Sequence, residues 1–153
     1  MRKNGFTLIE LLVVIAIMSI LTIITVSQFG TAQKRSRDVA RKADLNSLSK
    51  ALLNYYADHG VFPADITWDG EFKDDTNYIY MKVVPTENHQ SSAIDQYCYV
   101  AGGDDPLMPD KFALFSDLEN EEDNDYGNYS PSGCTEDYNF AIVSPNAEYE
   151  DFK

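Results

Sequence analysis

The chain has 153 residues and a formal net charge of −13 at pH 7, with 44% hydrophobic and 24% charged side chains. This length accommodates one domain of ordinary size, and the composition differs from that of disordered or collagen-like chains. The charged side chains are distributed unevenly along the chain. Segment 58–153 carries 22 acidic side chains against four lysines, whereas segment 1–57 carries a net charge of +5. Nucleic-acid binding needs clustered cations that displace counterions from phosphates, so the acidic region argues against direct binding of DNA or RNA.

An apolar run of 24 residues extends from Phe6 to Phe29. As a helix rising about 1.5 Å per residue, it is long enough to span the roughly 30 Å hydrocarbon core of a membrane. A cleaved secretory signal would need an apolar region of only about 7–15 residues and a cleavage site of small residues, which 27–30 does not provide. The run therefore predicts a membrane-spanning helix, and an uncleaved anchor is one interpretation of it.

Glu10 places a carboxylate near the start of this apolar run. A charge within the membrane interior costs roughly 2.5–3.5 kcal/mol on insertion. One interpretation puts Glu10 near the interface, where it complements the positive end of the helix and recovers about 0.3–1 kcal/mol. That gain offsets only part of the cost, so something else should repay the remainder.

The first twelve residues, MRKNGFTLIELL, resemble the leader of type IV pilins and type II secretion pseudopilins. In those families a short basic leader ends in glycine before phenylalanine, and threonine, leucine, a glutamate and an apolar run follow. The resemblance implies that a prepilin peptidase cuts after Gly5 on the cytoplasmic side and methylates the new amine of Phe6. It also implies that Glu10 pairs with the N-terminal amine of a neighbouring subunit, which would offset the desolvation of both charges.

The helix is expected to continue well beyond the apolar run, because neither proline nor glycine occurs between Gly30 and Gly60. One helix should therefore run from about Phe6 to about Ala57, over roughly 78 Å. The Asp58-His59-Gly60 turn should end it, with Gly60 as a left-handed cap.

The second half of this helix is predicted to be amphipathic. Its apolar stripe needs a partner surface and consists of Leu45, Leu48, Leu52 and Tyr55. The basic segment 33–42 lacks such a stripe and leaves two interpretations open. It is either a solvated linker or a basic belt that faces the acidic domains of neighbouring subunits.

The remaining residues predict a small β-rich head. Segments rich in aromatic and β-branched residues are expected to form strands at 78–84, 96–100, 111–118 and 138–143. An antiparallel sheet of these strands packed on the apolar stripe would give an α+β fold. The resemblance implies the same pilin-like architecture. We divide the chain into a cleaved leader (1–5), a transmembrane assembly helix (6–29), its amphipathic continuation (30–59) and the acidic head (60–153).

Cys98 and Cys134 are the two cysteines of the chain. An even pair in a small exported domain favours a disulfide over a metal or catalytic role. Such a bridge would stabilise the head by roughly 3–4 kcal/mol. The alternative is that Cys98 is a buried free thiol within a strand.

The sequence contains no nucleophile elbow, phosphate-binding loop, dinucleotide-binding loop or zinc-type cysteine and histidine spacing. We therefore expect no enzyme and no required cofactor. Calcium is a candidate ligand, because type II secretion pseudopilins, which the chain resembles, have a calcium site in a comparable loop. Its candidate ligands here are Asp117, Glu119, Asp123 and Asp125. The alternative is a solvated acidic loop, since the EF-hand pattern fails beyond Gly127.

Taken with the resemblance, these features predict a structural subunit of a type IV pilus or of a type II secretion-like pseudopilus. The choice between the two filaments is left open. Before assembly the leader would lie in the cytoplasm and the head outside the membrane, and the filament would then be extracellular or periplasmic. The partners implied are further copies of the chain, a prepilin peptidase and an inner-membrane assembly platform. The competing hypothesis is a single-pass, membrane-anchored extracytoplasmic binding protein that does not polymerise.

Overall fold

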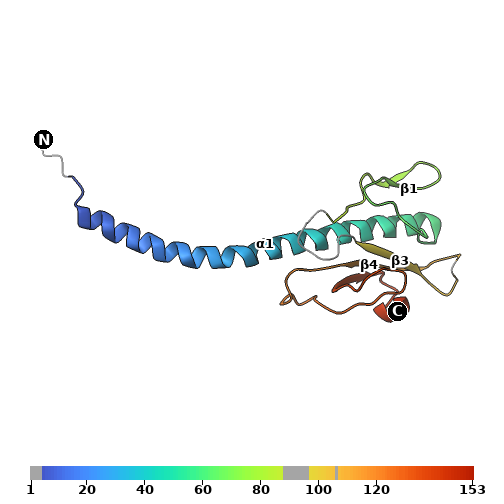
Figure 1. Ribbon diagram of the computed structural model, residues 1–153. Coiled ribbons are helices and arrows are strands. Elements are labelled where there is room, and N and C mark those ends of the chain that lie inside the picture. The colour runs from blue at the N-terminus through green and yellow to red at the C-terminus, as the bar shows by residue number, and fades with distance from the viewer. Residues whose placement is uncertain (1–4, 88–96, 106) are drawn as a thin grey trace.

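The computed structural model describes residues 5–87, 97–105 and 107–153, without the side chains of 24–28. One helix, α1 (Leu8–His59), spans 52 residues and carries the head along its C-terminal half (Figure 1). The helix ends where Gly60 adopts the left-handed conformation, with φ 73°, and donates its N–H to the Tyr56 carbonyl at 2.7 Å. The predicted continuous helix and its glycine cap are confirmed.

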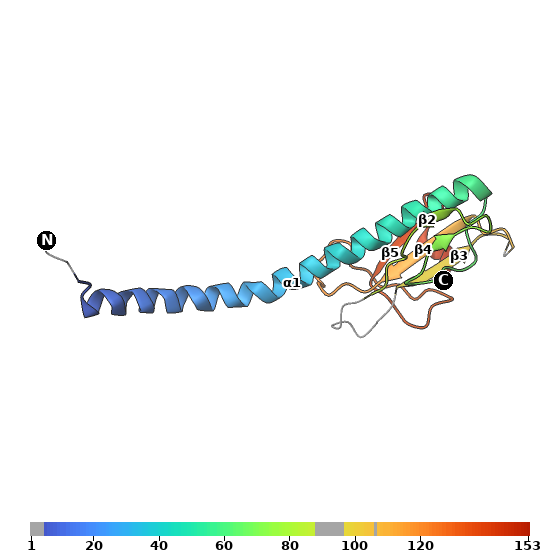
Figure 2. The ribbon, with the colours of Figure 1, turned by 90° about the horizontal axis from the view of Figure 1, so that it is seen from above.

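The head contains a three-stranded antiparallel sheet in the order β3-β4-β5. These strands are β3 (Cys98–Gly102), β4 (Lys111–Ser116) and β5 (Phe140–Val143). The central strand β4 pairs Phe115 with Cys98 on one side and Ala113 with Val143 on the other. Figure 2 shows the sheet alongside the second half of α1. The expected α+β architecture is therefore confirmed.

Strand 78–84 was expected in the same sheet, and the structure corrects this. Its core, β2 (Ile79–Met81), pairs instead with β1 (Phe72–Lys73) in a separate two-stranded hairpin. A strand of two residues has no measurable alternation, so the sequence pattern did not predict β1. The other strands match the expected segments with shifted ends, and Gln96 of the expected strand 96–100 lies outside the described residues.

Strand β4 separates two apolar cores, because alternate residues point to opposite faces of the sheet. Phe112 and Leu114 face α1 and pack in one cluster with the leucines of the apolar stripe. Leu45, Leu48 and Leu52 are all completely buried there. The stripe thus has the partner surface that the sequence predicted.

The second core lies on the other face of β4 and is closed by the end of the chain. Phe115 and Tyr138 pack there with Phe152, which belongs to the short 3-10 helix η1 (Tyr149–Phe152). The predicted disulfide joins Cys98 at the start of β3 to Cys134 in the loop beside this core, with 6.1 Å between the Cα atoms. Its sequence separation of 36 residues corresponds to a stabilisation of about 4 kcal/mol in the chain-entropy account.

Candidate functional site

The first half of α1 extends beyond the head as a bare stalk (Figures 1 and 2). Every described side chain from Gly5 to Ile23 is exposed, including Leu8 at 82% and Ile23 at 73%. A continuous apolar surface of this extent indicates an interaction surface rather than an ordinary exterior. In the part of the chain whose side chains are described, which has a gap at 24–28, no helix is both long and apolar enough to cross a membrane.

The predicted cleavage point lies immediately before this stalk. Gly5 and Phe6 are in a non-helical stretch that ends at Thr7, and the Phe6 side chain is 90% exposed. A peptide bond in an exposed, non-helical segment is open to a peptidase, since its backbone groups are not held in a helix. The leader residues before Gly5 lie outside the described residues.

Glu10 takes part in a capping box at the start of α1. Its Oε2 atom accepts the Thr7 backbone N–H at 2.8 Å and the Thr7 hydroxyl at 2.7 Å. In return the Thr7 hydroxyl oxygen accepts the Glu10 backbone N–H at 3.4 Å. This arrangement satisfies donors that a helix end otherwise leaves free. Pairing of Glu10 with a neighbouring subunit stays a prediction.

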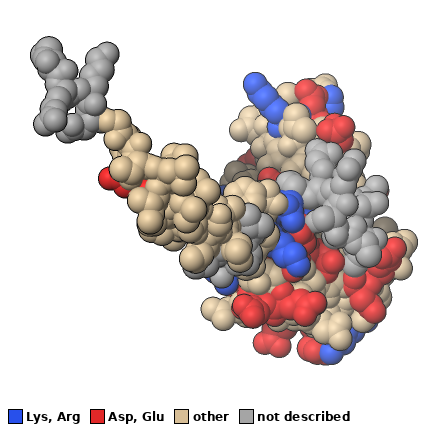
Figure 3. Space-filling model, turned by 60° about the vertical axis from the view of Figure 1, so that its left-hand side comes forward, with Lys and Arg blue, Asp and Glu red and all other residues tan. Residues whose placement is uncertain are grey.

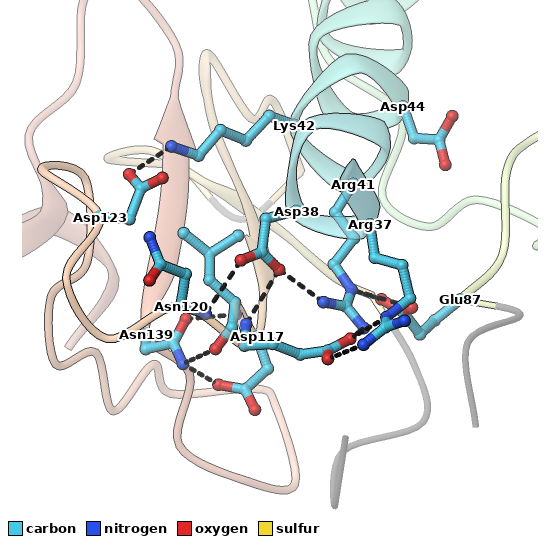
Figure 4. A network of polar contacts seen from close by, with 12 residues as sticks. Arg37, Asp38, Arg41, Lys42, Asp44, Glu87, Asp117, Asn120, Asp123 and Asn139 are labelled. Carbon is cyan, nitrogen blue, oxygen red and sulfur yellow. Dashed lines mark hydrogen bonds and ion pairs between the residues drawn. The ribbon is translucent and has the colours of Figure 1, made fainter. Parts of the chain in front are cut away.

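A polar network holds α1 to the head near the point where the stalk meets the head (Figure 4). Its centre is Arg41, which is completely buried among three carboxylates. The guanidinium donates to Asp38 at 2.7 Å, to Glu119 at 2.8 Å and to Glu87 at 3.0 Å. Buried charges persist only when they are paired and hydrogen-bonded, and this set meets that condition.

Two further contacts tie the same turn of helix to the segment after β4. Arg37 donates from Nε to the Glu119 carboxylate at 2.7 Å, and its Nη2 atom binds the second carboxylate oxygen. The Asp38 carboxylate accepts the backbone N–H groups of Glu119 and Asn120, each at 2.9 Å. A two-pronged guanidinium contact and a carboxylate on backbone donors are both geometrically specific. Together they fix the start of the acidic loop 117–125 on the helix.

Lys42 holds the far part of the same loop. Its ammonium donates to Asp123 at 2.5 Å and to Asp125 at 2.7 Å, and it lies 5.3 Å from the centre of the Phe140 ring. The hydrogen bond from Lys42 is the main cause that lowers the pKa of Asp123. The acidic loop, for which a solvated run was one of the two interpretations, is thus attached to the helix by Lys42.

The calcium prediction is not supported by this geometry. Of its four ligands, Asp123 and Asp125 bind Lys42, and Glu119 binds two arginines. Asp117 turns instead to the Asn139 amide. Throughout the residues that the structure describes, no group of three or more histidine, cysteine or acidic side chains could hold a metal ion. Lysine and arginine side chains therefore provide the positive charge that the prediction assigned to calcium.

The surroundings of Asp117 disfavour its ionised form. Burial is the main cause that raises its pKa, and the negative charges of Asp38, Glu87 and Glu119 raise it further. The positive charge of Arg41 acts in the opposite direction. Asp117 keeps a donor, because the Asn139 side-chain amide donates to it and to the Leu118 carbonyl.

The structure also changes the interpretation of the basic segment 33–42. Three of its cations, Arg37, Arg41 and Lys42, bind this chain's own head, so the segment is not a solvated linker. The partners lie about 80 residues away along the chain, and no sequence spacing predicts such a pairing. Only the charge contrast between the helix and the loop was visible in the sequence.

Each comparison with known proteins matches part of the chain. A family model described as the prokaryotic N-terminal methylation motif matches residues 1–26. The chain is 32% identical over 87 residues to the type IV major pilin protein PilE of Neisseria gonorrhoeae, covering 56% of this chain and 52% of that protein. It is 32% identical over 63 residues to the type II secretion system core protein G of Pseudomonas aeruginosa, covering 41% and 44%.

A third relative is the type IV major pilin protein PilA of Myxococcus xanthus, which is 39% identical over 57 residues, or 37% of this chain and 26% of that protein. The chain thus spans between about a quarter and about half of the length of these three relatives. No solved structure matches it significantly. The relatives are pilin and pseudopilin proteins rather than enzymes, and together with the motif they support the type IV pilin and pseudopilin family for this chain.

Proposed function

We propose, from this family and from the exposed apolar half of α1, that the chain is a structural subunit of a type IV pilus or of a type II secretion-like pseudopilus. The single observation that carries the proposal is the stalk, whose described apolar side chains from Phe6 to Ile23 are all exposed. Such a surface needs either lipid or other apolar helices around it. A subunit that passes from a membrane into a helical bundle meets both needs in turn.

The proposed sequence of events begins with membrane insertion through 6–29, with the leader in the cytoplasm and the head outside. A prepilin peptidase then cuts between Gly5 and Phe6 and methylates the new amine. An inner-membrane assembly platform adds the subunit to the filament, in which the stalk helices pack together. The exposed, non-helical position of Gly5 and Phe6 supports the cleavage step.

Glu10 has a proposed role at the assembly step. The capping box places its carboxylate beside Thr7, one residue from the amine that cleavage would create. Within an apolar bundle, this carboxylate would exchange its local donors for the ammonium of a neighbouring subunit. The pair would offset desolvation costs that neither charge could offset alone.

The test begins with the mature N-terminus. Mass spectrometry of membrane and sheared filament material should find Phe6 as the first residue, carrying a methyl group. Intact Met1 or Arg2 in that material would contradict the proposal. An uncut protein that stays in the membrane and forms no filaments would support the anchored binding protein instead.

The role of Glu10 is tested by Glu10→Leu, with Thr7→Val as the matched control. Glu10→Leu should leave insertion intact, since it removes a cost of roughly 2.5–3.5 kcal/mol, and should strongly reduce filament formation. Thr7→Val removes the capping hydroxyl but keeps the carboxylate, so it should still give filaments. Equal defects in both variants, or normal filaments from Glu10→Leu, would reduce Glu10 to a helix cap.

A further inference from the structure

The basic segment of α1 has two cations that form no ion pair with the described residues of this chain's own head, although the charge of Arg35 contributes to lowering the pKa of Asp123. Lys34 and Arg35 are exposed, and neither forms an ion pair with any residue in the described ranges. Lys34 lies four residues before the buried Asp38, and Arg35 lies seven before Lys42. Residues at these spacings share a helix face, so both cations lie on the face that turns toward the head, about two turns short of Arg41 and Lys42.

The acidic loop has a matching pair of anions. Glu121 and Glu122 are exposed and have no ion-pair partner among the residues that the structure describes. They lie between Glu119 and Asp123, which Arg41 and Lys42 hold against the helix. Figure 3 shows lysine and arginine side chains where the stalk meets the head and acidic side chains over the adjoining part of the head.

Packing of copies side by side makes these unpaired charges important. Chains with a formal charge of −13 repel one another unless acidic groups of one meet cations of the next. Lys73, Lys111 and Lys153 already form ion pairs within the chain. Apart from Lys34 and Arg35, the exposed lysines without an ion pair in the described part of the chain are Lys50 and Lys82. Lys34 and Arg35 are the adjacent pair among them.

The helix geometry gives the displacement that would bring the two pairs together. Seven residues of helix correspond to about 10 Å along the axis. A parallel copy that lies beside this chain and is displaced by that distance toward its N-terminus would bring its acidic loop to the level of Lys34 and Arg35.

We infer that Lys34 and Arg35 form a docking surface for Glu121 and Glu122 of a second copy of this chain. The inference rests on the proposed filament function and names the contact that sets one subunit against the next. The repeated attraction would compensate the mutual repulsion of the acidic heads. A headgroup surface of anionic lipid is the alternative occupant, and the experiment distinguishes it.

The experiment reverses the charges in the full-length chain. K34E/R35E and E121K/E122K should each reduce sheared filaments at least about fivefold, because attraction becomes like-charge repulsion. The fourfold variant, with both reversals, should restore the filaments to within about twofold of the natural chain. K50E/K82E is the matched control, since it changes the net charge as much as K34E/R35E, and it should leave the yield unchanged.

A second readout detects the contact directly. Carbodiimide treatment of mixed isotope-labelled and unlabelled filaments should join the Lys34 amine to the carboxylate of Glu121 or Glu122 across two copies, as mass spectrometry would show. If filaments form but neither the cross-link nor the rescue occurs, the inference is overturned while the proposed function stands. If K34E/R35E depletes the membrane pool and the fourfold variant does not restore it, lipid is the occupant, and the inference is again overturned. If the natural chain forms no filaments, the proposed function fails, and the same cross-link in membranes then decides whether the surface exists.

Discussion

Replacing Arg41 with methionine would remove the guanidinium from the centre of the polar network while keeping a side chain of similar length in a completely buried position. Three carboxylates would lose a donor: Asp38, Glu87 and Glu119. Removing one partner of a buried charge pair costs about 3–5 kcal/mol, because the other charge stays buried and uncompensated.

The structure indicates the lower end of that range. Glu119 would keep its two-pronged contact with Arg37, and Asp38 would keep two backbone N–H donors. We therefore expect Arg41→Met to lower the free energy of unfolding of the head by about 3 kcal/mol, which changes the folding equilibrium more than a hundredfold. This is a large share of the stability of an ordinary domain, about 5–15 kcal/mol.

Urea unfolding of the full-length chain in detergent would measure this loss. Trp68 is the single tryptophan and its ring lies 6.1 Å from that of Tyr97, so its fluorescence reports on the head. Arg35→Met is the control, because it removes an exposed arginine from the same helix and should change the stability by less than about 0.5 kcal/mol. A loss below about 1 kcal/mol for Arg41→Met would refute the argument that the network holds the head to the stalk.

Further changes test the remaining parts of the head in the same unfolding assay. Replacing both Cys98 and Cys134 with serine should cost about 3–4 kcal/mol, whereas an unchanged midpoint would mean that the bridge does not constrain the unfolded chain. Lys42→Met should cost about 1 kcal/mol at neutral pH. Since the Lys42 contact lowers the pKa of Asp123, its contribution is present above the ordinary value of 3.8 and is lost as the pH falls through the lowered one. A difference between Lys42→Met and the natural chain that persists at the lowest pH would contradict that linkage. Because the pKa of Asp117 is raised, Asp117→Asn should stabilise the head slightly at pH 7, a gain that should shrink as the pH falls toward the ordinary aspartate value; a clear loss would show that Asn139 requires the charge.

Features that depend on local spacing could be predicted from the sequence. The absence of glycine and proline between Gly30 and Gly60 indicated one long helix, and Gly60 was recognised as its cap. The leucines at helical spacing identified the face that meets the sheet, and the cysteine count predicted the disulfide. Each of these signals is a pattern within a few neighbouring residues or a simple count, so it survives without knowledge of the fold.

The pairing of the strands and the arrangement of the two cores could not be predicted from such patterns. The strand β1 is too short for an alternation to be seen, and without it the sequence offered no separate partner for β2. In β4 both faces are buried, so its apolar run gave a strand but not the two different cores on its two sides. The closing role of Phe152 likewise depends on where the chain end returns.

The polar network shows most clearly what tertiary structure alone decided. From the sequence, the acids of 117–125 resembled a calcium loop or a solvated run, and the cations of 33–42 a linker or a belt toward neighbours. Folding the head back onto α1 brings groups about 80 residues apart to within hydrogen-bonding distance, so Arg37, Arg41 and Lys42 meet carboxylates of their own chain. Charge is visible in a sequence, but the choice of partner depends on distances that only packing sets, because a Coulomb interaction is strong only at short range and away from water.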